Sequence, residues 1–432
     1  RSTLFPYTTL FRSRDHDVYG GGNAADVPAT NVTVSGGTIS GLFGGGHGNN
    51  AEDNLKAANV TGNVSVNVTG GTIAQVFAGS NLNGSIGGTV TLEIDKDDNA
   101  CDMKIGEVYG GGNMAAGNAG TITIGCTGTI VTGENGHAAH PENIGVSLEG
   151  IGTVYGGANQ ADIGTSESPS NITLNIHSGM VANVFGGNNT SGTIHGTIQV
   201  NIEKNDETCG WYVGNVYGGG NLARYTGSPV VNIKNGTVSG NVYGGGKGSS
   251  AEIEGSPVVT VGDLTPANSA YVAIVTGDVY GGGDAASVTG NTTVTLQKAN
   301  SEAGRLYGGG NQAGISGNTV ISMTAGTVTH AIYGGCNFTG TVGGTSTVTI
   351  TDGTIGTAFV SAPASIPLVV FGGGKGEGTS VTGQVTLNIG TKSGDTYTGS
   401  ANIYGNVYGG SENGEVHAVN VNLYGNSING NV

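Results

Sequence analysis

The sequence predicts an all-β protein that folds as a right-handed parallel β-helix, a β-solenoid of about 13–14 rungs with about three short strands in each rung. One reason is a motif of an aliphatic residue, an aromatic residue and two or three small residues, mostly glycine. It recurs thirteen times, at spacings of 24 to 46 residues. Segments of alternating apolar and polar residues, rich in β-branched side chains, lie between the copies. In such a solenoid each rung is stabilised mainly by stacking on its neighbours.

The aromatic residue of each copy aligns the thirteen repeats. The aligned residues are Tyr19, Phe43, Phe77, Tyr109, Tyr155, Phe185, Tyr217, Tyr243, Tyr280, Tyr307, Tyr333, Phe371 and Tyr408. The residue before the aromatic is always Val, Leu or Ile, so we expect this column, Val216 included, to face the interior. Eight copies carry asparagine four residues after the aromatic, and stacked amides can form hydrogen bonds from rung to rung.

Two residues after the aromatic, every copy has glycine, and we expect a structural role for this column. Stacked rungs lie about 4.7–4.9 Å apart. At a tight corner the chain therefore needs a positive φ angle or a very close approach, which glycine adopts without strain. The glycines are Gly21, Gly45, Gly79, Gly111, Gly157, Gly187, Gly219, Gly245, Gly282, Gly309, Gly335, Gly373 and Gly410.

The alternating segments, such as Val64–Val68 and Ile172–Ile176, are expected to form one strand of each rung. Glycine-containing turns follow them, and the aliphatic-aromatic strand then returns. Long insertions are expected after the alternating strand, at one equivalent place in the rung, where they form a loop edge. They are Asp95–Glu107, Gly125–Gly152, Glu203–Asn215, Gly262–Asp278, Thr357–Val369 and Gly390–Asn406. One further insertion, Gly48–Asn59, follows the glycines instead.

The aromatic column and its asparagines are the best candidates for a binding site. Strict alternation turns the aromatic ring outward when the preceding aliphatic residue is buried, and exposed rings beside asparagines can stack on sugar rings. The candidate binding residues are Tyr109, Tyr155, Tyr217, Tyr243, Asn113, Asn159 and Asn221. The alternative is that the strand bends at the glycines, so that each ring fills part of the core.

The acidic composition argues against several functions. The chain has 30 Asp and Glu against 14 Lys and Arg, a formal charge of −16, whereas nucleic acids and anionic membranes attract basic surfaces. No apolar run approaches the ~18 residues of a membrane-spanning helix. Gly244–Ser249 and Gly372–Gly376 look like phosphate-binding loops, but the lysine in each is followed by glycine. We therefore expect no nucleic-acid partner and no membrane insertion.

We expect no catalytic residues, no resident metal ion and no cofactor. Arginine is nearly missing after the first thirteen residues, and no rung gathers the carboxylates and bases that lyases and glycosidases use. The acidic segment with Asp95, Asp97 and Asp98 departs from an EF-hand loop, although it offers an opportunistic calcium site.

The four cysteines show neither CxxC pairs nor zinc-site spacing. They are Cys101, Cys126, Cys209 and Cys336. We expect small, buried, unpaired residues. The alternative is that Cys101 and Cys126, about one repeat apart, are neighbours.

The first thirteen residues, Arg1–Ser13, share no column with the repeats and resemble a translated sequencing adapter. Residues 1–13 are therefore excluded from the fold. Residues 14–432 are expected to form a single β-solenoid domain. The chain ends where the next motif would begin, so we expect a gene fragment that is truncated at both ends.

The VYGGGN motif, as at Val108–Asn113 and Val216–Asn221, and the alternating rungs resemble bacterial surface β-solenoids, namely parallel β-helix adhesins and autotransporter passenger domains. The resemblance covers Asp15–Val432. It implies an extracellular or cell-surface location, contact with a glycan or a host or cell-surface protein, no catalysis, and an anchor or translocator outside this segment. Two alternatives stay open: a purely structural surface filament or spacer, and a polysaccharide lyase or glycosidase of the parallel β-helix class.

Overall fold

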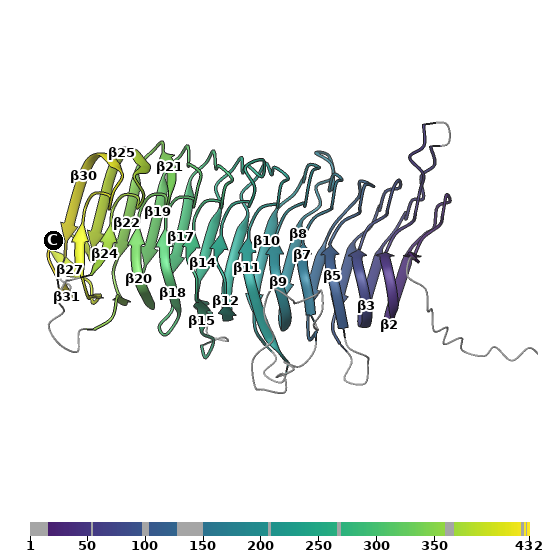
Figure 1. The fold of residues 1–432 in the computed structure, drawn as a ribbon, viewed down its shortest axis with the longest axis horizontal. Helices are drawn as coiled ribbons and strands as arrows, with labels where there is room; N and C mark the ends of the chain where they lie inside the picture. Colours follow the sequence, from purple (N-terminus) through teal and green to yellow (C-terminus); the bar gives the residue numbers. More distant parts are fainter. Residues whose placement is uncertain are drawn as a thin grey trace, which may run out of the picture.

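The computed structural model describes residues 16–52, 55–96, 103–127, 150–205, 209–265, 269–358, 367–424, 427–428 and 430–432. Regular structure in these residues consists of strands alone, and no described helix is long and apolar enough to cross a membrane. One sheet contains 29 strands, and its strand pairings are parallel. Figure 1 shows the rungs side by side along a rod, from the purple N-terminal strands to the yellow C-terminal strands. The structure confirms the all-β parallel solenoid that the repeat predicts.

Three strand positions recur in the rungs, and some long strands cover two of them. The alternating position is occupied by β2 (Thr30–Phe43), β3 (Val64–Phe77), β4 (Val90–Ile94), β6 (Thr121–Ile124), β8 (Ile172–Ile176), β10 (Ile198–Glu203), β12 (Val230–Val238), β14 (Val258–Val261), β17 (Thr292–Leu296), β19 (Thr319–Met323), β22 (Ser346–Ile350), β25 (Gly378–Ile389) and β30 (Glu415–Leu423). The aromatic position is reached by β2, β3, β1 (Val18–Tyr19), β5 (Met103–Tyr109), β7 (Gly150–Tyr155), β9 (Gly179–Phe185), β11 (Trp211–Tyr217), β13 (Val242–Tyr243), β16 (Val279–Tyr280), β18 (Glu302–Tyr307), β20 (Thr327–Tyr333), β24 (Leu368–Phe371) and β29 (Asn406–Tyr408).

A middle position lies between these two. Several of the strands above begin in it, and four short strands occupy it alone: β15 (Ala273–Val275), β23 (Thr354–Ile355), β28 (Asn402–Ile403) and β31 (Ser427–Ile428). The remaining strands are β21 (Thr339–Val342) and the antiparallel pair β26 (Thr391–Ser393) and β27 (Thr396–Thr398).

The alternating strands bury one side chain in two, as their period predicts. In β8, Ile172, Leu174 and Ile176 are fully buried, while Thr173 and Asn175 are half-buried. In-register pairing with β10 places each aliphatic side chain over an aliphatic partner in the next rung. Repeated along the rod, these columns form one continuous aliphatic core.

The aliphatic residue before each aromatic belongs to the same core, except Val18 in the first copy, which is 37% exposed. Val216 has no exposed surface and pairs with Val184 on one side and Val242 on the other. The next residue, Tyr217, points to the opposite face of the strand and belongs to a separate cluster made of the aromatic column. The rod therefore has two parallel lines of apolar contact, one aliphatic and one aromatic.

The glycines of the motif allow the rungs to approach closely at a corner. None of the thirteen glycines two residues after the aromatic has a positive φ angle. A Cβ atom built on Gly187 would lie 2.8 Å from the backbone nitrogen of Gly220 in the next rung, far inside contact distance. Positive φ angles occur instead at other glycines, such as Gly37 (98°) and Gly71 (112°), where β2 and β3 pass from the alternating position to the middle position. Both of the expected reasons for glycine apply, but at different places in the rung.

We expect Gly187→Ala to lower the free energy of unfolding by about 1–3 kcal/mol, the usual cost of overpacking, because the backbone of the next rung must move. Gly410→Ala is the matched control, since its Cβ would meet only Val416 Cγ2, at 3.7 Å. Its effect should stay within about 0.5 kcal/mol. Urea denaturation of the two variants measures the difference, and equal losses would refute the close-approach explanation.

Most of the insertions leave the rod at one turn. Five of the six join the alternating strand to the middle strand, and that turn lies along the lower edge of the rod in Figure 1. The prediction was wrong for Thr357–Val369, which lies between β23 and β24 and so interrupts the run from the middle strand to the aromatic strand. The insertion between β2 and β3 rises at the opposite edge.

A disulfide bond joins Cys126 and Cys209, whose Cα atoms are 5.6 Å apart. Cys126 follows β6 and Cys209 precedes β11, so the bond connects insertions of two rungs that have a further rung between them. The prediction of unpaired cysteines was wrong for these two, while Cys336 is free and buried. Cys101 lies outside the described residues, as do residues 1–13.

Candidate functional site

The thirteen aromatic residues form a single stack along the rod. Consecutive rings are nearly parallel, with centroids 4.5 to 5.1 Å apart. This distance matches the spacing of hydrogen-bonded strands, so the backbone sets the ring separation. From Phe43 to Phe371 no ring residue is more than 5% exposed. We call this set of thirteen residues the aromatic stack.

The stack corrects the binding role expected for Tyr109, Tyr155, Tyr217 and Tyr243. Alternation along the strand does turn these rings away from the aliphatic core, but both faces of each ring are covered by the rings of adjacent rungs. A sugar ring has no free face to stack on. The expectation failed because it considered one strand at a time, whereas the neighbouring rungs decide the exposure of the ring.

The asparagine column connects the rungs through side-chain amides. The amide nitrogen of Asn113 donates to Asn81 Oδ1 (2.9 Å), Asn159 donates to Asn113 (2.8 Å), and Asn221 donates to Asn189 (2.9 Å). The three predicted residues Asn113, Asn159 and Asn221 are half-buried. Because their amides are engaged in this ladder, their observed role is to join rungs.

The tyrosine hydroxyls of the stack lie next to the polar residues that stand two positions before the aromatic, such as Glu107 and Asp278. The hydroxyl of Tyr109 donates to Glu107 Oε2 (2.9 Å), and burial, together with this carboxylate, raises its pKa. Burial and then the charge of Asp278 raise the pKa of Tyr280 in the same way. Burial is also the main cause that raises the pKa of Tyr19 to about 12. The environment of the stack therefore favours the neutral, protonated form of these tyrosines.

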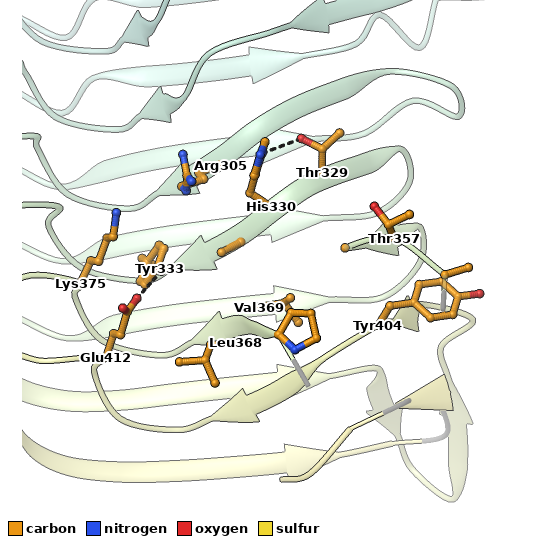
Figure 2. Close-up of a pocket in the computed structure, with 14 residues that line it drawn as sticks. Arg305, Thr329, His330, Tyr333, Thr357, Leu368, Val369, Lys375, Tyr404 and Glu412 are labelled. Atoms are coloured by element: carbon orange, nitrogen blue, oxygen red, sulfur yellow. Dashed lines mark hydrogen bonds between the residues drawn. The ribbon is translucent and has the colours of Figure 1, made fainter. Parts of the chain in front are cut away.

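A pocket of about 700 Å³ opens beside Tyr333 (Figure 2). Ala331 and Val369 line it, and both stand two residues before an aromatic, where ten of the thirteen copies have a polar side chain. In a typical rung that polar side chain lies against the stack, as Glu107 does against Tyr109. Alanine and valine leave this space open in two adjacent rungs. We call this cavity the Tyr333 pocket.

Charged and aromatic side chains surround the Tyr333 pocket. Lys375 and Glu412 occupy the column four residues after the aromatic, where most rungs have asparagine. Glu412 accepts a hydrogen bond from the hydroxyl of Tyr333. Arg305 Nη1 lies 3.4 Å from Asp278 Oδ1, whereas Lys375 has no ion-pair partner among the described residues. The pocket thus gathers two cations and one carboxylate in an otherwise acidic chain.

The sequence contains a signal for this pocket in the column of residues that stand two positions before the aromatic. This column lacks a polar side chain in two consecutive rungs, at Ala331 and Val369, and otherwise only at Gly41. The one misplaced insertion, Thr357–Val369, lies in the second of these two rungs. Lys375 drew attention only as part of a false phosphate loop. Each of these deviations from the repeat is small by itself. Stacking of the rungs brings the deviating residues to one place, which the sequence of a single rung does not show.

The predicted calcium residues are only partly described. Asp95 Oδ1 accepts a hydrogen bond from the backbone nitrogen of Cys126 (2.8 Å), next to the disulfide. Asp97 and Asp98 lie outside the described residues. No group of three or more His, Cys, Asp or Glu side chains with metal-binding geometry occurs in the part of the chain that the structure describes.

The fold and the columns define the class of the chain as a parallel β-solenoid repeat protein. Comparison with protein-family models, with curated proteins and with solved structures finds no match.

Proposed function

We propose that the chain is a secreted or cell-surface, adhesin-like repeat module. It binds a glycan or a host or cell-surface protein through its edge loops and repetitive faces, without catalysis. The observation that carries the proposal is the disulfide between Cys126 and Cys209, which joins two insertions on the loop edge. Disulfides persist in oxidising surroundings such as the cell exterior. An anchor or translocator outside this segment and an extracellular location are parts of the same proposal.

The burial of the aromatic stack shifts the expected contact surface toward the loop edge. The stack and the asparagine ladder are used to hold rungs together, and the insertions differ in length from rung to rung. A rod that presents unlike loops along one edge offers many weak contacts, and simultaneous contacts raise the overall affinity without a deep site. A plain spacer has no use for this variation.

The structural spacer stays as the second candidate, because the ladder and the stack alone account for a stable rod. The polysaccharide lyase or glycosidase is the third, and the Tyr333 pocket is where its acid and base would be sought. We expect no catalysis there and no requirement for calcium or another cofactor. The three candidates differ in their action on a polysaccharide. A binding module binds it without cleavage, a spacer does not bind it, and a lyase or glycosidase cleaves it.

The test is a glycan array and a mucin pull-down, run beside a polysaccharide-cleavage screen with calcium present. We expect binding without cleavage, and weaker binding by a Cys126→Ser, Cys209→Ser double variant whose circular dichroism shows an intact β-solenoid. Lys247→Ala, on the asparagine column, is the control and should bind normally. Reproducible cleavage that one Asp or Glu substitution abolishes would establish an enzyme, and no binding at all would favour the spacer.

A further inference from the structure

We infer that the Tyr333 pocket binds an acidic sugar, with the sugar carboxylate held between Lys375 and Arg305. This inference rests on the proposed glycan-binding function and assigns it one site and one ligand class. The volume of about 700 Å³ lies within the range of small-ligand pockets and suits one or two sugar rings.

The charges select an anion with a single negative charge. Lys375 Nζ has no ion-pair partner among the described residues, and one contact to Asp278 leaves most of the five N–H donors of Arg305 free. Glu412 adds one negative charge at the same end, which disfavours a densely charged ligand such as a highly sulfated chain. A carboxylate can pair with the cations while a sugar hydroxyl donates to Glu412.

The rest of the pocket suits the body of a sugar. Figure 2 shows Lys375, Tyr333 and Glu412 at one end, Tyr404 and Thr357 at the other, and the apolar side chain of Val369 between them. Hydroxyl-bearing side chains at the far end can form hydrogen bonds with sugar hydroxyls, and apolar side chains such as Val369 can pack against the C–H groups of the sugar ring. Charge at one end and mixed polarity at the other would orient the ligand.

The pocket is a single site on a repetitive rod. The space beside the ring opens where Ala331 and Val369 follow each other in the polar column, and Ala331 is only 4% exposed. The other rungs have a polar side chain beside the stack, as Asn241 donates to the hydroxyl of Tyr243 (3.2 Å), except the rung of Gly41 near the N-terminal end. We therefore expect one strong site for an acidic sugar in each chain, not one in each rung.

The experiment measures binding of a glucuronic-acid-terminated oligosaccharide to the full chain by calorimetry, beside its glucose-terminated and glucose-sulfate-terminated counterparts. We expect a stoichiometry near one and a preference of roughly tenfold or more for the carboxylate, the scale of one charge-assisted contact. Lys375→Gln should remove most of that preference. Lys247→Gln, which changes the same column outside the pocket, should leave it intact.

Ala331→Gln provides a second variant, because it restores a polar side chain that fills the column in other rungs. We expect it to abolish binding while the circular dichroism spectrum and melting temperature stay close to those of the parent. Equal affinity for the three oligosaccharides, preference for sulfate, or binding that survives both pocket variants would overturn the inference. If the glycan array is positive in that case, the proposed function stands. If the array and mucin assays are also negative, the proposed function fails as well.

Discussion

Val216→Asp is expected to lower the free energy of unfolding by roughly 3–5 kcal/mol, the cost of an unpaired buried charge. Val216 is fully buried, and the residues that pair with it in both neighbouring rungs are valines. The carboxylate would have neither water nor a polar partner. Because the same contacts recur in each rung, damage at one rung weakens the interfaces on both sides of it.

Lys247→Ala is the comparison, since Lys247 is exposed on the asparagine column and should change stability by no more than about 0.5 kcal/mol. Thermal and urea denaturation at pH 7, followed by circular dichroism, measure both variants. Acidification should partly restore the Val216→Asp variant, because a protonated carboxyl group is less costly to bury. Equal melting temperatures for the two variants would mean that the inward face has been assigned wrongly.

Alkaline pH is expected to unfold the rod in one cooperative step above pH 10. Seven fully buried tyrosines of the stack have a raised pKa, with burial as the main cause in each. A raised pKa means that the folded chain keeps protons that the unfolded chain releases, so stability is complete below pH 10 and falls as pH rises. Each group lowers the free energy of unfolding by about 1.4 kcal/mol per pH unit, so the seven together lower it by up to roughly 10 kcal/mol per pH unit.

Absorbance at 295 nm, which reports phenolate, should rise together with the loss of the far-ultraviolet β signal. Replacing Tyr217, Tyr243 and Tyr307 by phenylalanine should move the transition to higher pH, because the ring stays and the titrating hydroxyl is lost. Four copies of the repeat already have phenylalanine in this column, so the rod tolerates that residue. Gradual ionisation of the stack tyrosines in a chain that stays folded would contradict this account.

The fold was predictable because its pattern is local and repeated. Alternation such as that of Ile172, Leu174 and Ile176 specifies a strand and its buried face, and thirteen aligned copies specify the stacking direction. The column before the aromatic was assigned to the interior for the same reason, and Val216 lies there. These features depend on neighbours within one rung or in the equivalent position of the next.

The features that the sequence did not predict depend on contacts between rungs, which an alignment of the repeats does not show. The burial of Tyr217 comes from Phe185 and Tyr243 on either side, 4.6 and 4.8 Å away between ring centroids. Cys126 pairs with Cys209 two rungs away, whereas the repeat length suggested Cys101, about one repeat away, as its neighbour. The Tyr333 pocket arises where one column loses its polar side chain and one insertion changes place, and neither event is informative by itself.

The disulfide also changes how the rod would respond to tension. Rungs are joined by bonds that run along the rod, so force applied to the two chain ends loads the outermost interface first and peels rungs away in turn. The segment between Cys126 and Cys209 spans 83 positions, a length of about 280 Å when fully extended. While the bond is intact, this length cannot be released, and the rungs it encloses act as an inextensible link in the N-terminal half of the chain.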